Sequence, residues 1–169
     1  MVLGDEWLEG IGPHVTHIPH VRLIPHTGAD IQYFIDLLSR NFEDGHWQNV
    51  QIVILVLGAV DLRNITSEKV LLKYKALICI IRARLGDVII VCCSLPPRLG
   101  LEFKTGLEFN KDIAKIASAL SVEYFLLHRP FVCGKTAKPG YYESGMRMSR
   151  LGINVVVKMI KQYKVKLYM

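Results

Sequence analysis

Four short groups of residues in this chain have the types and spacing that hydrolytic chemistry uses. Gly4-Asp5-Glu6 lies near the start, Gly28 and Gly58-Ala59-Val60-Asp61 follow, and Ser144-Gly145-Met146-Arg147 lies near the end. Glycines let a backbone approach a substrate closely, and acidic, hydroxyl and basic side chains can act as nucleophile, orienting group or proton carrier. The groups would form one site if the fold brought them together.

The segments between these groups alternate between apolar runs and helical patterns. Strands are predicted at 1–3, 20–24, 51–57, 88–93 and 122–127, and helices at 30–42, from Thr66 or Ser67 to 85, at 107–120, and from Ser149 to Lys161 or Tyr163. We expect an α/β fold, a three-layer α/β/α sandwich with a parallel sheet of about five strands. Sites in such sheets lie at the carboxyl ends of the strands, where all four groups fall.

Two further patterns predict a loop before the last helix and the side of that helix that faces the core. Residues 129–142 contain Pro130, Gly134, Pro139 and Gly140 and are predicted to be a loop. In the last helix, the helical spacing predicts a core-facing side formed by Leu151, Val155, Val156, Met159 and Ile160.

Length and composition predict one domain over residues 1–169, excised from a longer chain. Hydrophobic residues make up 51% of the 169 residues, which is enough for a sizeable core. No apolar run approaches the ~20 residues of a membrane span, and the first residues lack the basic start of a secretory signal. We therefore expect a cytoplasmic protein without a membrane partner.

Neither the cysteines nor the histidines predict a metal site or another cofactor. Cys79, Cys92, Cys93 and Cys133 lack Cys-x-x-Cys spacing, so we expect buried free thiols in a reducing compartment. His14, His17 and His20 are three residues apart, but Pro13 and Pro19 interrupt the helix that would gather them.

Charge is distributed unevenly along the chain. Residues 1–128 carry 12 Lys and Arg against 14 Asp and Glu, whereas residues 129–169 carry nine against the single Glu143. Such a basic segment favours a polyanionic partner, nucleic acid first and an anionic membrane surface second. A solvated face that only keeps the domain soluble is the alternative.

The four groups, in this order and spacing, resemble the SGNH (GDSL) hydrolase family over the whole chain. The resemblance implies a catalytic serine at position 6, an oxyanion-binding asparagine at position 60, and an Asp-x-x-His pair at positions 144 and 147. This chain has Glu6, Val60, Ser144 and Arg147 there. Gly4, Gly28, Gly58, Asp5 and Asp61 match the family.

These replacements remove the chemistry of the family. Arginine stays protonated and cannot accept a proton as a base. Valine has no donor for a developing oxyanion, which removes roughly 3–4 kcal/mol of transition-state stabilisation. We therefore expect no catalytic residues and no small-molecule substrate, with Glu6 and Arg147 paired as ions or Arg147 contacting phosphate.

Two longer runs resemble a non-catalytic, RNA-binding branch of the family that belongs to insect germ plasm. They are Gly4-Asp5-Glu6-Trp7 and the stretch from Ser144 to Gly152. Residues 50–97 also resemble the degenerate SGNH domains of retroelement proteins, which are an alternative. The resemblance implies binding of mRNA, including 3′ untranslated regions, in germ-plasm ribonucleoprotein granules, with germ-plasm proteins as further partners.

The basic residues supply the candidate RNA contacts. They are Arg147, Arg150, Lys158 and Lys161 around the last helix, with Arg22 and Arg98 extending the surface on the side of the carboxyl ends. Tyr141 and Tyr142 are candidates for stacking on bases. Two alternatives remain: a protein-interaction module, which would bind no RNA, and an esterase of unusual mechanism, whose activity would depend on Glu6.

Overall fold

The computed structural model describes residues 1–5, 11, 14, 22–26, 28–40, 47–97, 103–134, 136–143 and 148–167, with only the backbone of Pro25 and residues 163–167. Five strands of this part form one parallel sheet in the order β2-β1-β3-β4-β5. They are β1 (Val2–Gly4), β2 (Leu23–Pro25), β3 (Ile52–Val56), β4 (Ile89–Cys93) and β5 (Glu123–Phe125). The predicted α/β class and five-stranded parallel sheet are confirmed.

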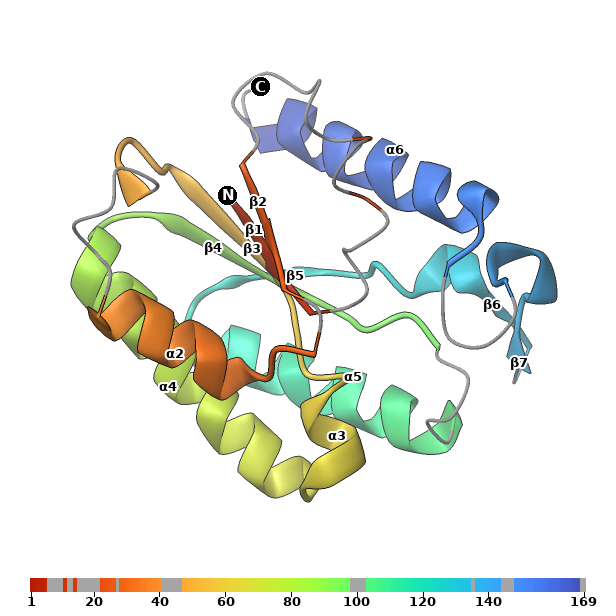
Figure 1. Cartoon of the computed structure of the whole chain (residues 1–169), viewed down its shortest axis with the longest axis horizontal. Helices are drawn as coiled ribbons and strands as arrows, with labels where there is room; N and C mark the ends of the chain where they lie inside the picture. The colour runs from red at the N-terminus through yellow and green to blue at the C-terminus, as the bar shows by residue number, and fades with distance from the viewer. Residues whose placement is uncertain are drawn as a thin grey trace.

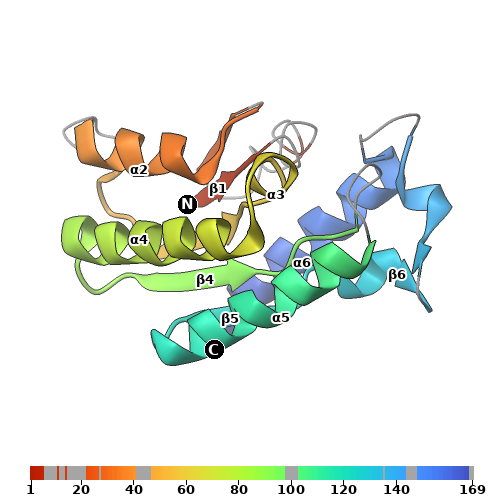
Figure 2. The same cartoon turned by 90° about the horizontal axis from the view of Figure 1, so that it is seen from below.

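Helices cover both faces of the sheet (Figure 1). Helices α2 (Ile31–Arg40), α4 (Ser67–Leu85) and α5 (Phe103–Ala119) lie on one face, and α6 (Arg150–Leu167) crosses the other (Figure 2). The chain moves in one direction along the sheet from β2 to β5. Because such crossovers are right-handed, the three helices between these strands must share one face. A short helix that the sequence did not predict, α3 (Asp61–Asn64), links β3 to α4.

The core consists of the central strands and the inner sides of the helices. Side chains of β3 and β4 point into both helical layers, which explains their unbroken apolar sequence; Val53, Leu55, Val56, Ile90 and Val91 are all buried. In α4 the apolar residues at helical spacing form a stripe that is buried at Val70, Tyr74, Leu77, Ile78 and Ile81, whereas Leu71 and Leu85 lie at its margin and are only partly buried.

The segment predicted as a loop between β5 and α6 has regular structure. It contains the 3-10 turns η3 (Arg129–Phe131) and η4 (Pro139–Tyr141), with a hairpin of β6 (Val132–Cys133) and β7 (Thr136–Ala137) between them. Its proline and glycine residues mark these turns, which is why the sequence suggested a loop.

The last helix begins as predicted and differs in its length and inner side. Ser149 caps it, since its Oγ accepts a hydrogen bond from the Gly152 N–H at 3.3 Å, and the helix extends to Leu167. Leu151 was predicted to face the core and is 55% exposed. Nine residues separate it from buried Ile160, and at 3.6 residues per turn the two lie on opposite sides of the helix.

Candidate functional site

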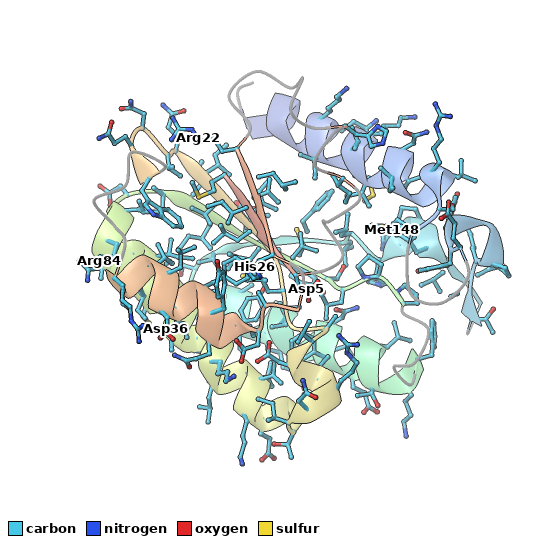
Figure 3. The ribbon with its side chains drawn as sticks, viewed as in Figure 1. Asp5, Arg22, His26, Asp36, Arg84 and Met148 are labelled. Carbon is cyan, nitrogen blue, oxygen red and sulfur yellow. The ribbon has the colours of Figure 1, made fainter. Side chains whose placement is uncertain are left out.

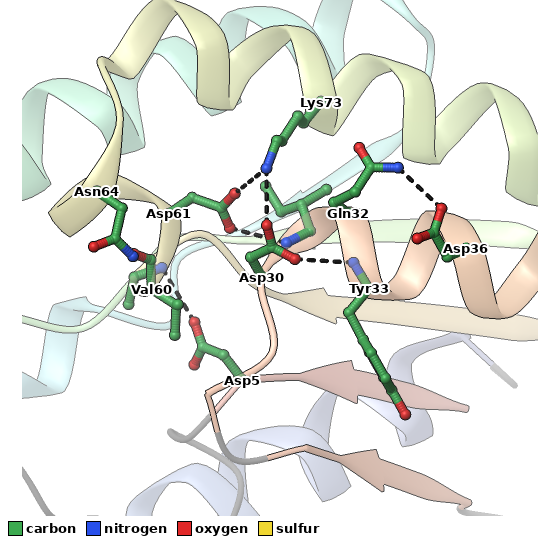
Figure 4. A network of polar contacts seen from close by, with 11 residues as sticks. Asp5, Asp30, Gln32, Tyr33, Asp36, Val60, Asp61, Asn64 and Lys73 are labelled. Carbon is green, nitrogen blue, oxygen red and sulfur yellow. Dashed lines mark hydrogen bonds and ion pairs between the residues drawn. The ribbon is translucent and has the colours of Figure 1, made fainter.

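The fold brings Asp5 of the first predicted group together with the third group at the carboxyl ends of β1 and β3 (Figures 3 and 4). Asp5 is fully buried, and its Oδ2 accepts a hydrogen bond from the Ala59 N–H at 3.1 Å. The Asp5 N–H donates to the Val56 carbonyl oxygen at 3.4 Å. Asp5 therefore ties the turn after β3 to the end of β1, which is a structural role.

Asp61 connects the same turn to two helices (Figure 4). Its Oδ2 accepts a hydrogen bond from the Ile31 N–H at 2.9 Å, and its Oδ1 lies 3.1 Å from the Lys73 Nζ. Lys73, on α4, also reaches Asp30 at 2.9 Å, and Asp30 caps α2 by accepting from the Tyr33 N–H. This cluster joins the turn after β3 to α2 and α4. The side chain of Asp61 is 1% exposed, so its carboxylate is inaccessible to a substrate.

The electrostatics of this cluster favour its ionised form. Burial raises the pKa of Asp30, but hydrogen bonds from Lys73 and the Tyr33 N–H outweigh burial and leave that pKa below its usual value. Burial lowers the pKa of Lys73, and the hydrogen bonds to Asp30 and Asp61 outweigh it and raise that pKa. The carboxylates and the ammonium group stabilise one another's charge.

The turn after β3 requires a glycine and ends at an aliphatic side chain. Gly58 has a φ of +116°, and a Cβ atom there would lie 2.9 Å from the ring of Phe109, so both conformation and space require glycine. Val60 precedes α3 and is 7% exposed. Its side chain is aliphatic, so the position where the family has its asparagine provides no side-chain hydrogen bond to a developing oxyanion.

Four predicted site residues lie outside the described part of the chain: Glu6, Arg98, Ser144 and Arg147. The expected Glu6–Arg147 ion pair therefore stays a prediction.

A serine–histidine pair that the sequence reading missed lies after β4 and β5. The Ser94 Oγ is 2.7 Å from the His128 Nδ1 and accepts a hydrogen bond from the His128 backbone N–H at 3.0 Å. The distance suits a nucleophile and its base, but Ser94 is 0% exposed and cannot meet a substrate. Burial, and next the charge of Arg129, lower the pKa of His128. The only available signal was that both residues closely follow predicted strands.

Two other side chains fix the segment that follows Ser94. Asn110, on α5, brackets Leu95: its Oδ1 accepts from the Leu95 N–H at 2.7 Å and its Nδ2 donates to the Leu95 carbonyl at 2.9 Å. The Tyr142 hydroxyl donates to the Pro97 carbonyl at 2.6 Å, and burial raises the pKa of Tyr142. Tyr142 is thus a packing residue in this structure, whereas Tyr141 is half-buried against Phe131 and has Lys138 5.6 Å from its ring centroid.

The outer face of α6 carries the remaining predicted RNA contacts. Arg150, Lys158 and Lys161 are all exposed. They lie on one side of the helix, since at 3.6 residues per turn Lys161 is about 20° and Lys158 about 80° around the helix axis from Arg150. Helix α6 contains no acidic residue, and none of the three has an ion pair within the described residues.

Arg22 does not extend this surface at the carboxyl ends, contrary to the prediction. It precedes β2 and donates to the Gln48 carbonyl at 3.2 Å, just ahead of β3. Figure 3 shows Arg22 and Asp5 at opposite ends of the first two strands. Because the strands are parallel, a residue before β2 must lie at the amino ends of the sheet.

The described residues contain no cluster of His, Cys, Asp or Glu that could hold a metal ion. All four cysteines, each in the described part of the chain, are free thiols. Cys92 and Cys93 are buried in β4 as predicted, and burial raises the pKa of Cys92 to about 12. Cys79 and Cys133 are exposed, contrary to the prediction, because they lie on the outer side of α4 and in the β6–β7 hairpin.

Comparison with solved structures finds proteins of similar fold and low sequence identity. A GDSL-like lipase from Bacteroides thetaiotaomicron has a TM-score of 0.82 at 16% identity, over 98% of this chain and 87% of the lipase. A lipase/acylhydrolase from Enterococcus faecalis gives 0.67 at 13%, over 96% and 93%. The OSK domain of Drosophila Oskar gives 0.71 at 14%, over 95% and 86%.

No protein-family model matches the chain, and no curated protein matches it by sequence. The order of the strands, the helical layers and these structural matches agree on the architecture. The chain has the three-layer fold of the SGNH acylhydrolases, which it shares with the OSK domain of Oskar.

Proposed function

We propose that this chain is a non-catalytic RNA-binding module that binds mRNA, including 3′ untranslated regions, through the outer face of α6. The observation that carries the proposal is the row of Arg150, Lys158 and Lys161, exposed and without an acidic partner in the described part of the chain. Contacts from Arg and Lys to phosphates supply most of the affinity of such surfaces.

Helix α5, on the other face of the sheet (Figure 1), shows that this row differs from an ordinary solvated face. On α5, Lys104 lies 3.9 Å from Glu108 and Lys115 lies 2.7 Å from Asp112. Those lysines have acidic neighbours that offset their field, whereas α6 has none in its sequence. An uncompensated row attracts a polyanion more strongly than an alternating one.

The absence of catalysis follows from four positions together. Glu6, Val60, Ser144 and Arg147 stand where an SGNH enzyme has its serine, asparagine, aspartate and histidine. Asp5 and Asp61 keep the frame of the site through backbone hydrogen bonds. We expect no hydrolysis of p-nitrophenyl acetate above the background rate, and activity that Glu6→Ala abolishes would contradict this.

The cellular role follows from the resemblance. A shared fold with the OSK domain of Oskar, together with the sequence runs at residues 4–7 and 144–152, supports a cytoplasmic role in germ-plasm ribonucleoprotein granules. Germ-plasm proteins would then be further partners.

The test is binding of a fluorescein-labelled 3′ untranslated RNA fragment at several salt concentrations between ~50 and ~200 mM. The double variant Arg150→Gln/Lys158→Gln should bind about tenfold more weakly at the lowest salt and show a salt slope smaller by about 1.4, the value for two lost single-strand phosphate contacts. Lys104→Gln/Lys115→Gln, with the same charge change on α5, is the control.

Equal losses in the two double variants would show that net charge alone attracts the RNA, and would contradict a site on α6. No binding by the wild type at the lowest salt would contradict RNA binding altogether.

A further inference from the structure

Among the described side chains of α6, the outer face also carries one large apolar residue. Leu151 is 55% exposed and lies beside Arg150 at the start of the helix. Leu151, Asn154 and Lys158 are spaced by three and four residues, so they lie in one line along the helix surface. A leucine within a basic row costs solubility without adding charge, and it offers an apolar contact to a ligand.

Asn154 lies next to Leu151 in this line. It is exposed, and its side chain has no hydrogen-bond partner within the described residues. An amide presents a donor and an acceptor together, which is what the edge of a nucleic-acid base requires. The line therefore contains an apolar contact, a base-edge partner and a cation in succession.

The backbone around Leu151 is held in place before any ligand binds. The Ser149 N–H donates to the Tyr141 carbonyl at 2.9 Å, and the Ser149 Oγ donates to the Gly140 carbonyl at 2.8 Å. Gly152 packs so closely on η4 that a Cβ atom would lie 2.5 Å from the Tyr141 oxygen. The first turn of α6 is thus fixed against η4, and Leu151 projects from a rigid support.

The packing of α6 restricts the form of RNA that fits this surface. Val156, Val157 and Ile160 are buried on the inner side of the helix, so its described side chains offer a ligand only a convex outer face. An A-form duplex has a major groove too narrow for a helix, and duplex-binding domains span about 16 base pairs. The row from Arg150 to Lys161 is about 17 Å long at 1.5 Å per residue, which suits a few nucleotides of one strand.

We propose that α6 binds single-stranded RNA, with one unstacked base lying against Leu151, the edge of that base at Asn154, and the flanking phosphates on Arg150 and Lys158. This inference rests on the proposed function and specifies its ligand. An apolar side chain can lie against the face of a base only where that base is unstacked, so preference for single strands follows from the position of Leu151.

The experiment measures binding of a fluorescein-labelled mixed-sequence RNA of about 12 nucleotides, as a single strand and annealed to its complement. Inorganic polyphosphate, which has the charge and no bases, is the competitor. Leu151→Ala should weaken single-strand binding about fivefold, the effect of losing a half-exposed leucine contact. The affinity for polyphosphate, calculated from its competition with the RNA, should stay unchanged. Leu72→Ala is the matched control, because Leu72 is 65% exposed on α4, across the sheet from α6.

The outcomes separate this inference from the proposed function. Equal binding of single strand and duplex, or an unchanged affinity in Leu151→Ala, would overturn the inference while loss of binding in Arg150→Gln/Lys158→Gln still supported RNA binding on α6. Equal weakening by Leu151→Ala and Leu72→Ala would also overturn it. Binding of neither RNA by the wild type would remove both proposals.

Discussion

Charged side chains have opposite environments at the carboxyl ends of β1 and β3 and on the outer face of α6. Asp5 and Asp61 are buried and accept hydrogen bonds from backbone N–H groups, whereas Arg150 and Lys158 are exposed and have no ion-pair partner in the described part of the chain. The first region uses charge to connect the turn after β3 to α2 and β1. The second leaves its charge exposed to solvent. Buried charge therefore has a structural role at the carboxyl ends, whereas the described charge on α6 is free of structural partners.

The largest expected effect comes from the buried cluster. Asp61→Ala should lower the free energy of unfolding by about 3 kcal/mol, because it leaves the Ile31 N–H and the Lys73 ammonium without their partner. Asp112→Ala, which breaks the exposed pair with Lys115, should cost no more than about 0.5 kcal/mol. Urea unfolding measures both, and similar losses would contradict the contrast between the two regions.

The sequence predicted the sheet, and the positions of Asp5 and Asp61 after its strands, because strand composition and order are local signals. β3 and β4 are apolar throughout, and only a parallel sheet with two covered faces accommodates such strands. Leu151 was placed incorrectly because periodicity gives a helix an apolar side without saying how far it extends, and Cys79 because all four cysteines were expected to be buried free thiols. The burial of each marginal position depends on which element packs there.

The candidate site was predictable only in part. Asp5 and Asp61 were identified by resemblance, but Lys73, the partner of Asp61, lies on a helix face where no motif marks it. Ser94 and His128 are 34 residues apart, and their contact depends on the neighbouring positions of β4 and β5 in the sheet. Arg22 was assigned to the wrong end of the sheet because the predicted second strand began too early, at residue 20, and β2 begins at Leu23.

The next largest effect tests the support of the α6 surface. Gly152→Ala should cost about 2 kcal/mol of stability, because its Cβ atom would collide with the Tyr141 carbonyl oxygen and push η4 away from α6. Gly140→Ala is the control, since a Cβ atom there meets nothing within 4 Å. Thermal unfolding by circular dichroism compares them. A Gly152→Ala protein as stable as the control would show that η4 and α6 are not held together.

A smaller loss of stability is expected at the Ser94–His128 pair, which follows β4 and β5. Ser94→Ala removes the partner of the His128 backbone N–H and of its ring Nδ1, and should cost about 1–2 kcal/mol. Ser39→Ala is its control, because the Ser39 hydroxyl is exposed and bonds only to the Ile35 carbonyl within its own helix. Equal stability of the two variants in urea would show that the Ser94–His128 pair contributes nothing to the fold.

The smallest effect is a pH dependence from His128. Burial and Arg129 hold the pKa of His128 in the folded protein below the 6.5 of an unfolded chain. As the pH falls through 6.5, the unfolded state binds a proton that the folded state does not, so stability decreases until the pH reaches the folded pKa. His128→Gln should remove this decrease, and His14→Gln, with its exposed side chain, should retain it. Urea unfolding between pH 7.5 and 5, above the range in which Asp30 titrates, measures the difference, and the same pH dependence in both variants would show that the decrease arises from another group.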